Sequence, residues 1–265
     1  MLMSKSLQDP ENHKLSIQVS LDGFSFYIKN ENDSSYVDTH SLHFEHTHAP
    51  EQALSKIKDV FSNLPILDNV FKEVKVIYDN ELFTMVPEAL FDQNNLADYL
   101  KFNTKILQTD FTVFDELEAG GLINVYIPYS NINNFFFDHF GSFSFFHSQT
   151  VFLKSVLDKK ALTADIKEVH VHIAETSLAI LIKKNNCLLL NNRFNFQNAP
   201  DCVYYILYCY EQLQLDPEVN PILLYGQVKE TDEVYALIYQ YIRNVSIVQT
   251  PLKKQELDHT YLQYL

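Results

Sequence analysis

Residues Lys14–Ile28 read KLSIQVSLDGFSFYI, and this stretch decides the fold class. Apolar and polar residues alternate along its first half, and they alternate again from Phe24 onward. Between the two runs stands Asp22-Gly23, a dipeptide that tolerates the positive φ angles of a type I′ turn. The stretch therefore predicts an antiparallel hairpin, and the alternation in Tyr36–Phe44 predicts a third strand beside it.

A helix and a buried strand follow this hairpin. Pro50 suits the first position of a helix, where its missing N–H costs nothing, and apolar residues then recur at helical spacing as far as Phe61. Glu73–Tyr78 is a short run rich in β-branched residues, which is typical of a buried central strand.

The same order of elements returns 154 residues later, counted from Lys14 to Glu168. Glu168–Ile182 reads EVHVHIAETSLAILI, and its apolar positions coincide with those of the first hairpin, with a turn at Glu175-Thr176-Ser177. The further predicted elements are a strand at Leu188–Phe196, a helix opening at Ala199-Pro200-Asp201, a strand at Pro221–Tyr225, a helix at Glu230–Arg243 and a strand at Val245–Val248. Each half thus reads β-β-β-α-β-α-β, which indicates an internal duplication.

A connector of a different character lies between the halves, at Phe111–Leu157. It predicts a hairpin of Thr112–Leu117 and Leu122–Ile127 that turns at two glycines, and a helix near Thr150–Leu157. An aromatic-rich stretch, Phe135–Phe146, separates them. We interpret it as packing between the lobes; the alternative is an exposed hydrophobic docking patch.

The chain resembles an uncharacterised family from Bacteroidetes, domain of unknown function 3822. The phrases that carry the resemblance are LSIQVSLDGFSFYI (15–28), IPYSNINNFFFDHFGSFSFFHS (127–148) and PILLYGQV (221–228). The duplicated plan is also similar to the superfamily of actin, heat-shock ATPases and sugar kinases, and most of all to its pilus-assembly and secretion-platform members.

The resemblance implies an α/β protein with a duplicated ribonuclease-H-like, or actin-like ATPase, fold. It has two lobes, each β-β-β-α-β-α-β around a mixed five-stranded sheet. We expect a flexible N-terminus over residues 1–12. The first lobe, including the connector, then covers residues 13–145, and the second lobe with a C-terminal tail covers 146–265. The tail is expected to dock onto the first lobe or to serve as a partner-binding peptide.

In ATPases of that superfamily, an Asp-x-Gly turn in each first hairpin wraps the phosphates, and a later Gly-Gly receives the adenosine. The matching positions here are degraded. Gly23 survives beside Asp22, Glu175-Thr176-Ser177 contains no glycine, and Gly226 stands alone next to a tyrosine. These six residues are the candidate cofactor-binding positions in a cleft between the lobes. We expect no cofactor there, or at most weak binding of Mg-ATP, and assign no catalytic residue.

Composition limits the partners and the compartment. The formal net charge of −14 opposes binding to nucleic acid, and we read the Lys159-Lys160, Lys183-Lys184 and Lys253-Lys254 doublets as solvated loop residues. The three cysteines form no C-x-x-C pair, and Cys202 and Cys209 lie seven apart on one face of a predicted helix, as buried thiols would. A polar N-terminus and the lack of a long apolar run predict a cytoplasmic protein that is not inserted in a membrane.

Histidines and carboxylates form no familiar catalytic pattern. His40, His43, His46 and His48 crowd one predicted strand, but strand spacing lets only the last two chelate one ion, so we expect no metal site. His170 and His172 share a strand face and are expected to be hydrogen-bonded core residues, with a pH-sensitive role as the alternative. Glu73 and Asp79 only flank a central strand, which disfavours a nuclease.

The favoured hypothesis is a non-catalytic scaffold or regulatory protein-binding module, a pseudo-ATPase that works through a protein partner or as a homo-oligomer. The competing hypothesis is a nucleotide-binding ATPase or small-molecule kinase. That hypothesis relies on Asp22, Gly23, Glu175 and Gly226, together with a magnesium ion, in the cleft.

Overall fold

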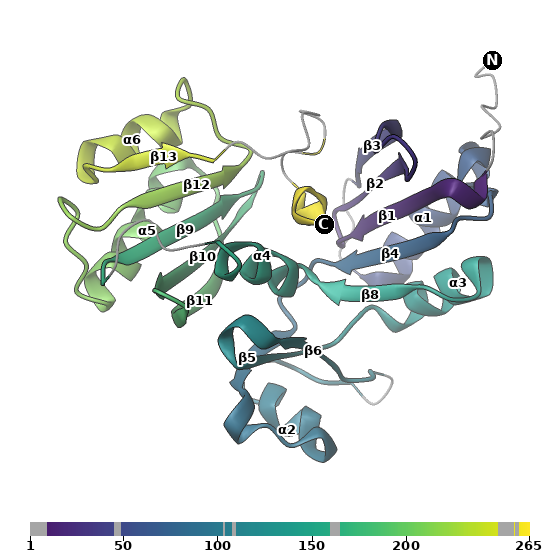
Figure 1. Ribbon diagram of the computed structural model, residues 1–265, viewed down its shortest axis with the longest axis horizontal. Helices are drawn as coiled ribbons and strands as arrows, with labels where there is room; N and C mark the ends of the chain where they lie inside the picture. The colour runs from purple at the N-terminus through teal and green to yellow at the C-terminus, as the bar shows by residue number, and fades with distance from the viewer. Residues whose placement is uncertain are drawn as a thin grey trace. The chain divides into compact units, whose positions relative to one another are not determined.

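The computed structural model describes residues 10–44, 49–102, 104–107, 110–159, 165–248, 257 and 260–265 (Figure 1). These residues divide into two compact units. The first unit holds the chain up to Glu116, the segment Ile123–Val151 and Leu265, and the second holds Leu117–Leu122 and Phe152–Tyr264. Among the described residues, no helix has the length and apolar character that a membrane span requires.

The first unit is built on a five-stranded sheet in the order β3-β2-β1-β4-β8. The first three strands are antiparallel neighbours, and β4 and β8 then run parallel to β1. The bounds are β1 His13–Val19, β2 Gly23–Asn30, β3 Tyr36–His43, β4 Glu73–Tyr78, β8 Ser144–His147, with helices α1 Pro50–Asn63 and α3 Ser130–Phe140. The predicted hairpin, third strand, first helix and buried strand of this half are all confirmed.

The second unit repeats this plan with a sheet in the order β11-β10-β9-β12-β13. The bounds are β9 Lys167–Ile173, β10 Ser177–Lys184, β11 Cys187–Asn195, β12 Ile222–Gly226, β13 Val245–Ile247, with helices α5 Ala199–Gln212 and α6 Glu233–Tyr241. Helix α5 begins where the Asn198 side chain accepts the Asp201 N–H at 2.9 Å, so a capping residue satisfies one of the free amides of the first turn. Helix α1 has no such cap and begins instead with Pro50.

Matching register shifts in the two sheets support the duplication more strongly than the order of elements does. The β2–β3 ladder shifts register between Ile28 and Lys29, and the β10–β11 ladder shifts between Ile182 and Lys183. Both pairs are 154 residues apart, the offset found in the sequence. A bulge is an irregularity that chance pairing of strands does not reproduce at a fixed position. The two halves are therefore versions of one structural unit.

The aromatic-rich stretch completes the first repeat. Phe135, Phe136 and Phe137 lie in α3, and Phe145 lies in β8. The stretch therefore supplies the second helix of the first repeat and the fifth strand of its sheet. Phe136 is fully buried in the core of the first unit, where its ring centroid lies 6.1 Å from that of Phe61 on α1. The interpretation as packing between lobes is therefore wrong, and of the predicted exposed patch only Phe137 is strongly exposed, at 61%.

An insertion between β4 and α3 forms a small three-stranded sheet in the order β5-β7-β6. Its elements are β5 Phe83–Pro87, α2 Leu96–Leu100, β6 Val113–Leu117 and β7 Leu122–Tyr126. Val86, Leu100 and Val125 form its own core. The hairpin predicted in the connector is β6–β7, and the helix predicted after it is α4, Ser148–Leu157. Short 3-10 turns cover Pro10–Asn12, Pro65–Asp68, Glu88–Leu90, Gln93–Asn95, Glu118–Gly120 and Tyr261–Tyr264.

Two sequence-based expectations are corrected in the second unit. Lys183 is fully buried on β10 rather than solvated in a loop, because its phase in the strand points it into the unit. In the described end of the tail, Tyr261–Tyr264 pack within the second unit, where the Tyr261 ring stacks on His172 with centroids 4.2 Å apart, and Leu265 alone belongs to the first unit. Cys202 and Cys209 are buried on α5 as predicted. The predicted flexible N-terminus, except for residues 10–12, lies outside the described residues, as do Lys160, Lys253 and Lys254.

Candidate functional site

The first predicted phosphate position, Asp22 and Gly23, belongs to a closed two-residue turn of the first unit. The Ser20 N–H donates to the Gly23 carbonyl at 3.0 Å, so Leu21 and Asp22 are the central residues. Neither Asp22 nor Gly23 has a positive φ, so the predicted type I′ turn centred on Asp-Gly is wrong. Gly23 opens β2 instead, where an added Cβ would lie 3.1 Å from the Leu42 carbonyl oxygen. The Asp22 side chain is exposed.

The second predicted position forms the same turn in the second unit. The Ala174 N–H donates to the Ser177 carbonyl at 2.9 Å, and this bond is equivalent to the Ser20–Gly23 bond at the 154-residue offset. Glu175 and Thr176 are the exposed central residues, and the Ser177 hydroxyl accepts a hydrogen bond from Arg193 at 3.2 Å. At this offset Glu175 matches Leu21 and not Asp22, so the two carboxylates do not occupy equivalent turn positions.

Gly226, the third position, ends β12 beside the end of β9. Its φ is +85°, and an added Cβ would lie 2.3 Å from the Ile173 carbonyl oxygen, so only glycine fits. The same carbonyl accepts the Gln227 N–H at 2.8 Å. Because β9 and β12 are parallel, Gly226 and the Glu175–Thr176 turn lie at the same edge of this sheet. Asp22 and Gly23 belong to the other unit.

These three positions share a chemical property. A phosphate loop works by directing several unused backbone N–H groups at its anion. Here the N–H groups of Ser20, Ala174 and Gln227 donate to carbonyls of the protein itself. The turns therefore keep the geometry of the duplicated fold, and these three N–H groups are already hydrogen-bonded within the protein.

Histidine and carboxylate groups do not form a metal centre among the described residues, where no cluster of three or more metal-binding side chains occurs. His40 stacks on Phe26 with ring centroids 5.1 Å apart and lies 3.3 Å from an oxygen of Asp38. His43 is exposed at the end of β3. His46 and His48 lie outside the described residues.

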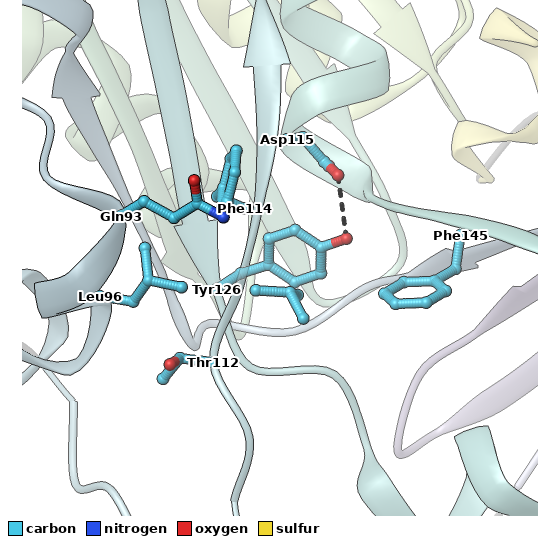
Figure 2. A pocket seen from close by; sticks show the side chains of 8 residues that line it. Gln93, Leu96, Thr112, Phe114, Asp115, Tyr126 and Phe145 are labelled. Carbon is cyan, nitrogen blue, oxygen red and sulfur yellow. Dashed lines mark hydrogen bonds between the residues drawn. The ribbon is translucent and has the colours of Figure 1, made fainter.

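A pocket of about 400 Å³ lies in the first unit, along the inserted sheet (Figure 2). Leu96, Phe114 and Phe145 supply apolar walls, and Asp115 and Tyr126 supply the polar groups. Figure 2 shows the hydroxyl of Tyr126 directed at Asp115, to which it donates a hydrogen bond of 3.0 Å.

Asp115 supplies the carboxyl group of this pocket. It is 9% exposed, and burial raises its pKa to about 6, although hydrogen bonds from Thr150, the His147 N–H and Tyr126 act in the opposite direction. One carboxyl oxygen accepts from Tyr126, and the other accepts the His147 N–H at 2.9 Å. The group therefore ties β6 to β7 and to the end of β8, and its chemistry toward a ligand is limited to hydrogen bonding with the lone pairs that remain.

His147 continues this buried network at the end of β8. Its Nδ1 accepts the Gln149 N–H at 3.1 Å, so Nε2 carries the proton and donates to the Asn80 carbonyl at 3.2 Å. Asn80 in turn donates to the Ile127 carbonyl at 2.9 Å. The imidazole is thereby held as one neutral tautomer between the main and the inserted sheets of the first unit.

A second buried polar network covers the face of β9 that turns away from α5. His170 Nε2 donates to Glu168 at 3.3 Å, and its Nδ1 lies 2.9 Å from the Tyr225 hydroxyl. Burial lowers the pKa of His170. His172 Nδ1 lies 2.7 Å from the Tyr264 hydroxyl. Both histidines are thus hydrogen-bonded core residues, as predicted.

Lys183 joins this second network to helix α4. Its ammonium group lies 3.8 Å from Glu168 and donates to the carbonyls of Val156 at 2.9 Å and Lys159 at 3.2 Å. Burial lowers its pKa, and Glu168 raises it. A cation at the last turn of α4 satisfies carbonyls that have no partner within the helix and complements the helix dipole.

Sequence reasoning missed Asp115, Glu168 and Lys183. A signal was available for two of them, because Asp115 stands in the apolar phase of its strand and Lys183 follows the apolar run Leu178–Ile182, whereas Glu168 shares its strand phase with the two histidines. A charged residue in such a position indicates a buried and partnered charge.

Comparison with solved structures identifies the fold. A Bacteroides thetaiotaomicron VPI-5482 protein with an actin-like ATPase fold and unknown function is 20% identical, with a TM-score of 0.84 over 98% of this chain and 100% of that one. PilM, in the PilM–PilN type IV pilus biogenesis complex, is 10% identical, with a TM-score of 0.62 over 96% and 97%. The cytoplasmic domain of Vibrio cholerae EpsL, an inner-membrane component of the type II secretion system, is 11% identical, with a TM-score of 0.46 over 95% and 92%.

The two likenesses with the higher TM-scores show that this chain has the actin-like ATPase fold, with two mixed five-stranded sheets. No curated protein matches the chain by sequence. The family model described as "Protein of unknown function (DUF3822)" matches residues 3–245. The chain therefore belongs to this family, as its sequence phrases indicated.

Proposed function

We propose that this chain is a non-catalytic actin-like module, a cytoplasmic pseudo-ATPase that acts as a scaffold or regulatory protein by binding a protein partner. The observation that carries the proposal is the internal use of the turn amides. The N–H groups of Ser20, Ala174 and Gln227 donate to carbonyls of the chain itself at 2.8–3.0 Å. For these three N–H groups to bind a phosphate, those bonds would have to break.

Gly226 supports the same interpretation. In ATPases of the superfamily a glycine after this strand makes room for the nucleotide, whereas here the Ile173 carbonyl fills the space beside Gly226. The glycine is thus explained by the packing of β9 against β12. The PilM structure supports the choice of a protein partner, because it is a protein–protein complex built on this fold.

The competing function is a nucleotide-dependent ATPase or small-molecule kinase. The specific observation in its favour is that Asp22 and Glu175 are both exposed on the first-hairpin turns of the two repeats. Carboxylates in such turns are the groups that would hold a magnesium ion and its water.

Calorimetric titration with Mg-ATP separates the two functions. We expect no saturable heat with a Kd tighter than about 100 μM, which corresponds to about −5.5 kcal/mol. Saturable binding that the variant Asp22→Asn with Glu175→Gln abolishes would overturn the proposal and establish the competing site. Saturable binding that survives in this variant would also overturn it, and would place the nucleotide elsewhere.

A further inference from the structure

Helices α5 and α6 of the second unit carry exposed tyrosines that neither network nor turn explains. Tyr204 and Tyr208 on α5 and Tyr239 and Tyr241 on α6 are 62%, 43%, 60% and 56% exposed. Tyr204 and Tyr208 lie four residues apart on one side of α5, and this exposed side of α5 is called the tyrosine face. The chain has sixteen tyrosines, and these four are the ones that are strongly exposed. Helices α5 and α6 are neighbours that contribute to the same core.

Helical spacing explains why these rings point outward. Helix α5 buries Cys202, Ile206 and Cys209 against the sheet, and Tyr204 and Tyr208 occupy the opposite side of the helix. Their rings stack on each other with centroids 6.2 Å apart, and on α6 Tyr239 stacks on Tyr235 at 6.0 Å. Each stacked ring restricts the side-chain motion of its neighbour. The pair therefore presents an ordered apolar surface with hydroxyl groups at its edge.

The surroundings of the tyrosine face are acidic. Residues 199–243 contain seven carboxylates and two basic residues, a formal net charge of −5. Glu211 follows Tyr204 and Tyr208 at helical spacing on the exposed side of α5, and Glu230 and Glu233 are exposed at the start of α6. Aromatic rings bordered by carboxylates match one chemistry above others, namely Arg or Lys side chains with their aliphatic stems.

We propose that the tyrosine face binds a segment of a protein partner in which basic and apolar residues are interleaved. Guanidinium or ammonium groups lie over the rings and pair with the carboxylates, while apolar side chains of the segment cover the ring edges. This inference rests on the proposed function and specifies the partner class. A second copy of the chain is disfavoured as the occupant, because two acidic faces of a chain with net charge −14 repel each other. The same charge opposes nucleic acid.

The test is a fluorescence anisotropy titration with a labelled synthetic peptide that repeats Arg-Leu-Ser, against the same peptide with Glu in place of Arg. The wild-type chain is expected to bind the basic peptide and not the acidic one. Tyr204→Ala with Tyr208→Ala is expected to weaken binding by roughly tenfold or more, since aromatic anchors dominate such interfaces. Glu211→Gln with Glu233→Gln is expected to weaken binding at low salt and to flatten its salt dependence. Phe137→Ala, an equally exposed aromatic on α3 of the first unit, is the matched control and should bind as wild type.

Several results would overturn the inference: no binding of the basic peptide, wild-type affinity in the tyrosine variant, or an equal loss in Phe137→Ala. A wild-type dimer in sedimentation that the tyrosine variant converts to monomer would also overturn it, in favour of self-association. Because the proposed function is tested by Mg-ATP, the two can fail separately. A failed peptide titration beside a flat Mg-ATP titration removes this surface alone.

Discussion

Gly226→Ala is expected to destabilise the second unit strongly. The added Cβ would lie 2.3 Å from the Ile173 carbonyl oxygen, so the ends of β9 and β12 must separate. That movement breaks the hydrogen bond from the Gln227 N–H, and alanine must also adopt a φ of +85°. Strain at positive φ costs about 1–2 kcal/mol, and the lost bond with its overlap about 2–3 more, so the expected loss is about 3–5 kcal/mol.

Gly141→Ala is the matched control. Gly141 also has a positive φ, +75°, but nothing lies within 4 Å of its added Cβ. Alanine there suffers the backbone strain alone, about 1–3 kcal/mol at a φ of +75° and a ψ of −73°. Urea denaturation followed by far-UV circular dichroism measures the free energy of unfolding of each variant. If Gly226→Ala loses no more stability than Gly141→Ala, the packing role assigned to Gly226 is wrong.

The remaining predictions concern buried ionisable groups. Because the folded pKa of Asp115 is about 6 and its unfolded pKa about 4, the folded state holds the extra proton between these values. The unfolding free energy of the wild type, relative to that of Asp115→Asn, should therefore fall by up to about 3 kcal/mol as the pH rises from 4 to 6, and then level off. Denaturation series at each pH measure this difference, and a difference that does not change with pH would contradict the prediction. Lys183→Met should cost about 3 kcal/mol in urea denaturation because it removes the ammonium group that binds the Val156 and Lys159 carbonyls and lies beside Glu168, whereas Lys184→Met, at a half-buried lysine, should cost under about 0.5; equal losses would refute the capping role. Native alkylation followed by mass spectrometry should label Cys187 rapidly and the two buried thiols slowly, since burial raises their pKa values; equal rates would contradict the packing of α5.

Regular alternation made most of the fold predictable from the sequence. Strand β4 begins and ends at the predicted residues, Glu73 and Tyr78, because a run of β-branched residues bounded by polar ones admits one assignment. The offset of 154 residues predicted that the two hairpins correspond to each other. It also relates the two register shifts, which no sequence pattern predicts.

The aromatic stretch was harder to assign because consecutive phenylalanines show neither a helical nor a strand spacing of apolar residues. Phe135–Phe137 presents three consecutive apolar residues, of which only the middle one is fully buried. Neither helical nor strand periodicity stands out in such a run. Its assignment to α3 follows from tertiary packing, since Phe136 meets Phe61 on α1.

The sequence predicted where the candidate sites lie along the chain but not their backbone geometry or their contacts. Asp22-Gly23 was placed correctly at a turn, but its type depends on the pairing of Ser20 with Gly23, which the dipeptide preference does not fix. The Asp115 pocket needed the insertion to fold against β8, a long-range contact with no local signal. Gly226 was recognised as a surviving glycine, yet its reason, the Ile173 carbonyl, lies on another strand.

At each candidate phosphate position one backbone N–H group, that of Ser20, Ala174 or Gln227, already donates to a carbonyl of the fold. Amide-resolved NMR of the isotope-labelled chain measures this directly, through hydrogen exchange and through shifts on addition of Mg-ATP. We expect the N–H groups of Ser20, Ala174 and Gln227 to be protected from exchange and to keep their shifts as Mg-ATP is added. Fast exchange at these amides, or saturable shifts at two or more of them, would show that the turns open to phosphate and would contradict this expectation.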